Sequence, residues 1–314
     1  MRIGIVVDSG CDLPREFIDQ NKIEILPVTI HLQGGDFVDV RDPAATLDFY
    51  DKHAGSAGDS GTSPFSTAQI KNLFLERMVG VYDFVFCLTI ASSRSPIFEN
   101  ATQASLQILN EYKPYRAKAG LPGPFALRVV DTQNLFAAQG VIAIEAVRQI
   151  KLGQTNPNKI RERLEFLVQN LYAYMIPRDL HYLRSRAQKK GDRSVGWAAA
   201  TFGSLLDIKP VLRCHRNETA PVGKVRHFDQ GAEKLLANVT NRVKAGLLTP
   251  TLCFSYGGEI SQMRKLPGYD KVQRACKAAK VEIHESVMSV TGGVNVGEGA
   301  FAVGFAAEPH QLEL

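Results

Sequence analysis

A serine-rich turn at residues 91–96 is the segment of this sequence best suited to bind a small anion. It follows an apolar run and precedes a helical pattern, for which Ser95 is a favourable N-cap and Pro96 a favourable first residue. The first N–H groups of a helix lack helical partners and carry partial positive charge. The hydroxyls of Ser92, Ser93 and Ser95 therefore predict an anion-binding site at this helix start.

A second hydroxyl-rich segment that ends in proline lies upstream. Thr62, Ser63 and Pro64 precede a helical pattern at residues 65–78, so Thr62 is also expected near a helix start. Because the first turns of two helices can point at one group, Thr62 and Ser95 are predicted to face the same anion.

Motifs for catalysis and metal binding are missing from the sequence. There is no GxxxxGK[ST] phosphate loop, and no GxSxG turn that would mark Ser92 or Ser95 as a nucleophile. The seven histidines show no HExxH spacing, and no cysteine–histidine cluster suggests a metal site. No general base for Ser95 is evident, which favours binding over covalent catalysis. We predict no catalytic residue, no metal and no enzymatic activity.

Composition and charge are those of an ordinary globular protein. The chain has 314 residues, of which 45% are hydrophobic and 22% charged. Its net charge of +5 is too small to indicate nucleic-acid binding. Five widely spaced cysteines are typical of reduced thiols. With no signal-peptide pattern and no apolar run of roughly 18 residues, a cytoplasmic location is expected.

The first half of the chain alternates predicted strands and helices, as in an open, mainly parallel α/β domain. Strands are expected at residues 3–7, 23–32, 84–90 and 125–130. A helix is expected at residues 135–151, where small residues at 137, 138 and 140 would let it pack close to a sheet. Ligands of such domains bind at the carboxyl ends of the strands. Hydroxyl residues follow three of these strands: Ser9, Ser95 and Thr132. Ser9 has two interpretations, since it can either stabilise its own turn or line the same crevice as Ser95.

The second half is predicted to be a mixed α+β domain. The polar segment at residues 153–158 is the clearest boundary, which divides the chain into domains of residues 1–155 and 156–314. A basic run at residues 184–193 also has two interpretations. It is either a solvated loop or a surface that docks on an anionic partner or membrane.

The motifs resemble those of the DegV family of fatty-acid-binding proteins, which includes the binding subunits of bacterial fatty acid kinase. Residues 8–13 are similar to the family's DSxxDL motif, 61–64 to its TSxP loop, and 91–96 to its SSxxSGT turn. Further matches are residues 130–132, 208–210 and 224–226. Each match is short, but their order and spacing cover nearly the whole chain.

This resemblance implies a two-domain DegV-like α/β protein that holds one long-chain fatty acid between its domains. It implies that Thr62 and Ser95 bind the carboxylate, and that the bound fatty acid is presented to a fatty acid kinase partner. The family also uses an arginine and a histidine, for which Arg193 and Asn295 are the counterparts here. The sequence departs from the family pattern at Asn295 and at Pro96, which replaces a glycine.

Burial of the lipid tail is expected to dominate affinity. A tail of roughly fourteen methylenes offers about 11 kcal/mol before the cost of association. Residues 197–206 and 294–305 are candidates for lining it, although plain core is the competing interpretation. No cofactor is expected besides the fatty acid. Two alternatives stay open: an enzyme acting on a phosphorylated or carboxylated metabolite in this crevice, and an interaction module that has lost its ligand.

Overall fold

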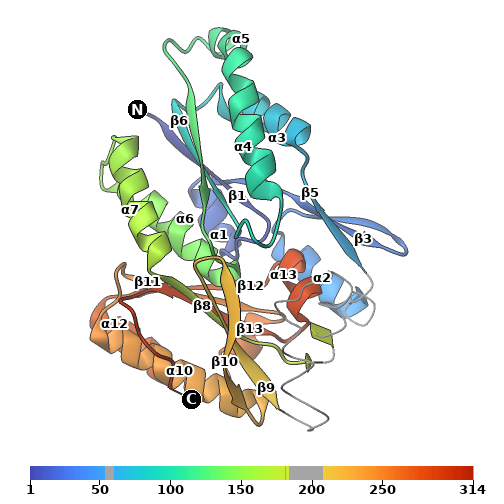
Figure 1. The fold of residues 1–314 in the computed structure, drawn as a ribbon, viewed down its shortest axis with the longest axis vertical. Helices are drawn as coiled ribbons and strands as arrows, with labels where there is room; N and C mark the ends of the chain where they lie inside the picture. The colour runs from blue at the N-terminus through green and yellow to red at the C-terminus, as the bar shows by residue number, and fades with distance from the viewer. Residues whose placement is uncertain (54–59, 181, 184–207, 314) are drawn as a thin grey trace.

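The computed structural model describes residues 1–53, 60–180, 182–183 and 208–313. These residues form two large β-sheets with helices between and around them, and a smaller sheet at one side (Figure 1). One large sheet is parallel and the other mixed, so the α/β fold expected from the sequence is confirmed. No helix in the described part of the chain is long and apolar enough to cross a membrane.

The first sheet is parallel throughout, in the order β2-β1-β6-β7. Its central strands, β1 (Ile3–Asp8) and β6 (Phe84–Thr89), are almost fully buried, as expected for continuous apolar runs. The edges are β2 (Glu24–Leu26) and β7 (Ala126–Asp131). Because all four strands point the same way, the loops that follow them meet at one edge.

The strand predicted at residues 23–32 is divided at Pro27, which lacks the N–H that a central strand donates. The first part is β2. The second part, β3 (Val28–Leu32), leaves the parallel sheet and pairs with β4 (Gly35–Asp39) and β5 (Gly61–Pro64). These three strands form the small antiparallel sheet, in the order β4-β3-β5.

Short helices complete the first half of the chain. They are α1 (Arg15–Gln20), α2 (Pro43–His53), α3 (Thr67–Leu73), α4 (Ile97–Gln107) and α5 (Tyr112–Lys118). A π-helix, Phe74–Met78, continues α3, and a 3-10 turn, Ile108–Asn110, continues α4. Helix α5 contains Pro114 in its first turn, where a missing N–H is tolerated.

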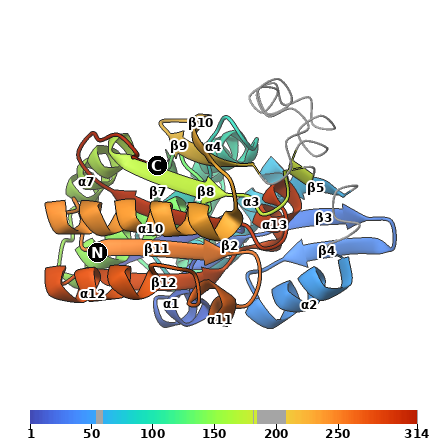
Figure 2. The ribbon, with the colours of Figure 1, turned by 90° about the horizontal axis from the view of Figure 1, so that it is seen from below.

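The second sheet has the order β10-β9-β8-β13-β11-β12, and only β11 and β12 pair in parallel. Its strands are β8 (Leu171–Ile176), β9 (Lys209–His215), β10 (Glu218–Val225), β11 (Thr251–Tyr256), β12 (Glu282–Val287) and β13 (Phe301–Ala306). Helices α10 (Phe228–Ala245) and α12 (Tyr269–Ala279) pack on its outer face (Figure 2). The short helix α11 (Ile260–Met263) follows β11.

Helix α6 (Phe136–Lys151) is buried between the two large sheets. Small residues in its sequence predict a close approach to a sheet, and the structure confirms it. A Cβ added at Gly304 of β13 would lie 2.3 Å from the Ala138 Cα. One continuous hydrophobic cluster therefore includes residues of both sheets. The predicted boundary at residue 155 falls between α6 and α7 (Pro157–Gln169) and stays a prediction.

Near the carboxyl end, a glycine-rich segment forms helix α13 (Val290–Val296). The Ser289 hydroxyl caps it by accepting a hydrogen bond from the Gly292 N–H at 2.9 Å. A Cβ added at Gly293 would lie 2.2 Å from the Tyr50 hydroxyl oxygen, so only glycine fits there. This close approach lets α13 rest on α2 and on the small sheet.

Candidate functional site

The serine turn, residues 91–96, lies at the carboxyl edge of the parallel sheet between β6 and α4 (Figure 1). Helix α4 begins one residue later than predicted, with Pro96 in the N-cap position and Ile97 as its first residue. The Ser95 Oγ nevertheless accepts a hydrogen bond from the Ile97 N–H at 3.3 Å. Ser95 therefore stands at the start of α4 and is partly buried.

Ser92 and Ser93 use their hydroxyls to hold this turn in place. The N–H and the hydroxyl of Ser92 both donate to the Asp131 carboxylate at the end of β7, at 3.1 and 2.5 Å. The Ser93 hydroxyl donates to the backbone carbonyl of Asn217 at 2.8 Å. Whether either side chain also contacts a ligand stays a prediction.

Thr62 lies on strand β5 of the small sheet and not at a helix start, which corrects the sequence prediction. Helix α3 begins at Thr67, and Ser66 caps it in a capping box with Gln69. Thr62 is directly opposite Ile30 of β3, so the two side chains share one face of the sheet. Ile30 packs against Val290 and Val294 of α13, so Thr62 lies on the α13 side.

A hydrogen bond connects the segments that carry Thr62 and Ser95. The Asn100 Nδ2, in the first turns of α4, donates to the Phe65 carbonyl at 2.9 Å. Phe65 follows β5 directly, and helices α3 and α4 pack against each other. The tertiary structure thus joins the helix that follows the serine turn to the segment that follows the threonine strand, although Thr62 itself lies in a sheet.

Asn295 lies on α13, where its Nδ2 donates to the Thr291 carbonyl at 2.7 Å. One residue earlier, the Val294 carbonyl accepts a hydrogen bond from the Tyr182 hydroxyl at 3.0 Å. Asn295 and Thr62 therefore belong to the same unit, made of the small sheet and α13. Arg193 and the basic run at residues 184–193 lie outside the described residues, as do residues 197–206.

The Ser9 hydroxyl is fully buried and occupied within the protein. It lies 2.5 Å from the Asp39 carbonyl and accepts a hydrogen bond from the Val28 N–H at 3.0 Å. These bonds secure the passage of the chain from β2 to β3 next to Pro27. Of the two interpretations of Ser9, the geometry favours the structural one, and its role as a ligand residue stays untested.

Asp8 is a buried carboxylate before the serine turn, and the sequence left it, like Ser9, between turn chemistry and the crevice of Ser95. It accepts hydrogen bonds from the Ile90 N–H at 2.6 Å, the Gly10 N–H at 2.8 Å and the Gln139 amide at 3.1 Å. Burial raises the pKa of Asp8 to about 6, although these hydrogen bonds act in the opposite direction. Asp8 thereby fixes the chain where it enters the serine turn.

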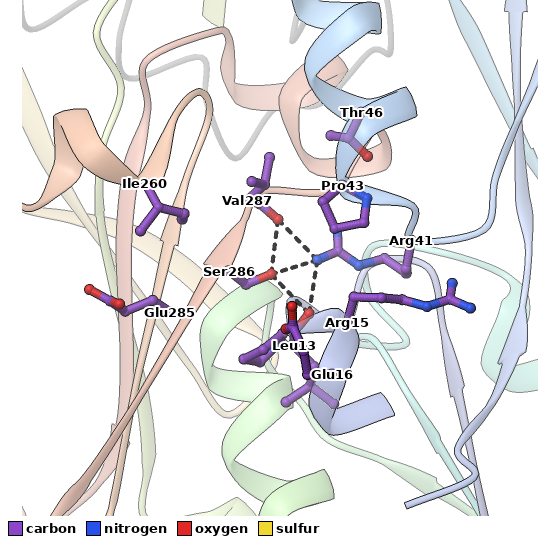
Figure 3. A pocket seen from close by; sticks show the side chains of 11 residues that line it. Leu13, Arg15, Glu16, Arg41, Pro43, Thr46, Ile260, Glu285, Ser286 and Val287 are labelled. Atoms are coloured by element: carbon purple, nitrogen blue, oxygen red, sulfur yellow. Dashed lines mark hydrogen bonds between the residues drawn. The ribbon is translucent and has the colours of Figure 1, made fainter. Parts of the chain in front are cut away.

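Arg41 was also missed, because nothing in its local sequence distinguishes it. Its side chain is buried, and its Nη2 donates to the Ser286 hydroxyl at 2.7 Å and to the Val287 carbonyl at 2.9 Å. Figure 3 shows the guanidinium pointing at these residues, with Thr46 and Ile260 around a small cavity. Arg41 thus joins the loop before α2 to the edge of the second sheet.

Two small cavities lie in the described part of the chain away from the predicted carboxylate site. The one beside Arg41 has a volume of about 160 Å³. The other, about 290 Å³, lies between α1 and the π-helix and is lined by residues such as Ile18, Met78 and Tyr82. Neither is lined by Thr62 or Ser95, and both are smaller than typical ligand pockets of about 300–1,000 Å³. We assign the lipid to neither.

Comparison with known proteins relates the whole chain to one family. A family model described as "Uncharacterised protein, DegV family" matches residues 2–308. A DegV domain-containing protein of Xanthomonas campestris pv. campestris is 55% identical over 313 residues, which are 99% of each chain. Protein DegV of Bacillus subtilis is 24% identical over 307 residues, which are 96% of this chain and 98% of that one.

Solved structures share the fold over almost the full length. The crystal structure of DegV, a fatty acid binding protein from Bacillus subtilis, has a TM-score of 0.76 at 22% identity, covering 98% of this chain and 100% of that one. A stearic acid-binding protein from Eubacterium ventriosum has a TM-score of 0.76 at 17% identity, covering 97% and 98%. At these identities the similarity establishes the fold, and the fatty acids are ligands of those two proteins.

Proposed function

Because the chain belongs to the DegV family, we propose that it binds one long-chain fatty acid, with the carboxylate held by Thr62 and Ser95. We call these two residues together the head-group site. The observation that carries the proposal is the Asn100–Phe65 hydrogen bond, which ties the start of α4 to the segment after β5. Two hydroxyl side chains on segments joined in this way can approach one carboxylate from two directions.

The tail and the carboxylate are expected to contribute differently to the free energy of lipid binding. Burial of the tail supplies most of the affinity, at about 0.8 kcal/mol for each methylene. Each hydrogen bond to the carboxylate adds about 1.5–3 kcal/mol and depends on its charge. We therefore infer that Thr62 and Ser95 set the orientation of the lipid and the preference for an acid.

We further propose that the protein is a carrier without catalytic activity of its own, which works in the cytoplasm. It would present the fatty acid carboxylate to a kinase partner, with transient contact to a membrane as a route of lipid exchange. In this proposal Arg193 and Asn295 complete the surroundings of the carboxylate, and Ser92 and Ser93 shape the turn. The support is the family membership, the position of Ser92 and Ser93 in the turn that carries Ser95, and the position of Asn295 on the helix that packs on the small sheet.

Native mass spectrometry of the protein purified from a bacterial host tests the main proposal. We expect a mass increase that matches one long-chain fatty acid and disappears on denaturation. Delipidated protein should bind a fatty acid at least about tenfold more tightly than the alcohol of the same length, because only the acid offers a charged acceptor. Absence of both co-purified lipid and added-lipid binding overturns the proposal. Equal affinity for acid and alcohol overturns the assignment of the head-group site.

A further inference from the structure

The Asp131 carboxylate, at the end of β7, is a junction between three segments. Its Oδ1 accepts hydrogen bonds from the N–H groups of Ser92 at 3.1 Å and Gln133 at 2.8 Å. Its Oδ2 accepts from the Ser92 hydroxyl at 2.5 Å and from the Asn217 Nδ2 at 2.9 Å. The Asp131 side chain therefore bonds the serine turn, the residues that follow β7, and Asn217 in the turn between β9 and β10.

Asn217 is at the tip of the β9–β10 hairpin. It and Arg216 have positive φ angles of 66° and 50°, as a tight two-residue hairpin turn requires. The Asn217 N–H donates to the Gln133 carbonyl at 2.9 Å, and its carbonyl accepts from the Ser93 hydroxyl at 2.8 Å. The hairpin tip thus rests on the serine turn and on the loop after β7.

The same turn that contacts Asp131 also presents Ser95. The Arg94 N–H donates to the Ala91 carbonyl at 2.9 Å, which closes a turn over residues 91–94, and Ser95 follows this turn directly. Displacement of the Ser92 backbone would therefore move Ser95 relative to the start of α4. Asp131 does not need to touch a ligand to influence where the Ser95 hydroxyl lies.

We propose that Asp131 and Asn217 couple the head-group site to the β9–β10 hairpin, so that carboxylate binding and docking of the hairpin tip stabilise each other. This inference rests on the proposed function. Asp131 is a positioning residue in this scheme, because it orders the serine turn before the lipid arrives. Since coupling between two sites is reciprocal, anything that holds the hairpin tip would also tighten lipid binding, and release of the tip would weaken it.

Hydrogen exchange with and without a saturated fatty acid such as palmitate tests this coupling. In the wild type, palmitate should slow exchange in residues 91–96 and also in residues 213–219. Asn217→Gly removes the bond to Asp131 and tolerates the positive φ angle. It should abolish the lipid-dependent protection of the hairpin and weaken palmitate binding about tenfold, as loss of one hydrogen bond to a charged group predicts.

Arg216→Gly is the matched control, because it changes the same turn at a similar φ angle. The Arg216 Nε donates to the Gln169 carbonyl at 2.9 Å, at the end of α7, so this side chain bonds a different segment from those that Asn217 holds. This variant should keep both the affinity and the hairpin protection. Asp131→Asn should weaken binding of the acid more than binding of the corresponding alcohol, since it disturbs the position of Ser95 and not the tail.

The outcomes separate this inference from the proposed function. If the wild type binds no fatty acid, the proposed function fails and the coupling fails with it. If the wild type binds palmitate but the hairpin gains no protection, only the coupling fails. Equal effects of Asn217→Gly and Arg216→Gly, or equal losses of acid and alcohol binding in Asp131→Asn, would also overturn it.

Discussion

The Arg41 Nη1 lies 3.2 Å from the Asp12 Oδ1, and both side chains are almost completely buried. The pair joins the two large sheets, because Asp12 also accepts hydrogen bonds from the Ser255 hydroxyl and the Ser289 N–H. Burial raises the pKa of Asp12, while Arg41 and the hydrogen bonds act to lower it. Without Arg41, nothing of opposite charge would offset the burial of this carboxylate in the described network.

Arg41→Met is therefore expected to destabilise the protein by about 3–5 kcal/mol, the usual cost of leaving one buried charge of a pair unpaired. Urea unfolding at pH 7 would measure the change. Arg15→Met is the matched control, since Arg15 forms an exposed pair with Asp19 at 2.9 Å. It should cost less than about 0.5 kcal/mol. Similar losses in both variants would contradict the importance of the Arg41–Asp12 pair.

Thr62→Ala combined with Ser95→Ala should weaken fatty acid binding about a hundredfold or more, through loss of two hydrogen bonds to the carboxylate. Binding of the corresponding fatty alcohol should change little, because the tail contacts remain. Titration of delipidated protein with both ligands measures the two affinities.

Ser63→Ala supplies the control for that experiment. Ser63 neighbours Thr62 on β5, so its side chain points to the opposite face, where its hydroxyl lies 2.8 Å from the His31 Nε2. This variant should bind the fatty acid as the wild type does. A loss as large as that of the double variant would show that disturbance of β5, and not the Thr62 hydroxyl, is responsible.

Gly304→Ala tests the close packing of α6 on β13. The added Cβ would lie 2.3 Å from the Ala138 N and Cα, which are backbone atoms of a buried helix and cannot move aside easily. We expect the free energy of unfolding to fall by about 1–3 kcal/mol or more. Gly34→Ala places a Cβ with no atom within 4 Å and should change stability by less than about 0.5 kcal/mol. A tolerated Gly304→Ala would mean that α6 and β13 lie further apart.

Glu145 provides a prediction about acid stability. Burial acts to raise the pKa of Glu145, but hydrogen bonds from Arg148, Arg163 and Thr249 outweigh it and lower the pKa from 4.5 to about 2. The unfolded chain therefore binds more protons than the folded protein between these values. The stabilisation is complete above pH about 4.5 and is lost as the pH falls towards about 2.

Glu145→Gln should therefore cost about 2 kcal/mol at pH 7, and its deficit relative to the wild type should shrink as the pH falls from 4.5 to 3. Chemical unfolding over this range would measure it. Glu165→Gln is the control, because Glu165 is half exposed and lies 3.6 Å from Arg161. A deficit that does not depend on pH would show that Glu145 acts through packing and not through its charge.

Local patterns predicted much of the fold correctly. Continuous apolar runs identified β1 and β6, and the small residues of α6 identified a helix that packs closely on a sheet. The serine turn was placed correctly between a strand and a helix, with an error of one residue at the start of α4. These features depend on periodicity and residue size over a few positions, which a sequence displays directly.

Other features depended on pairing between distant segments. The tertiary structure moved Thr62 from an expected helix start to a strand opposite Ile30, because Pro27 sends the chain into a separate sheet. Prediction of this change would have required knowing which strands pair. Ser9 shows the same limit, since its hydrogen-bond partner Asp39 is 30 residues away.

The sequence by itself therefore determined the α/β class and the family, and it supplied the hydroxyl residues of the proposed head-group site. Only the tertiary structure decided which polar side chains hold that site together. Asp131 and Asn217 are 86 residues apart, and Arg41 and Ser286 are 245 residues apart. Such partners are selected by the packing of two sheets around α6, since a buried polar group must find a hydrogen bond wherever the fold places one. Partners that are selected in this way show no periodic pattern in the sequence.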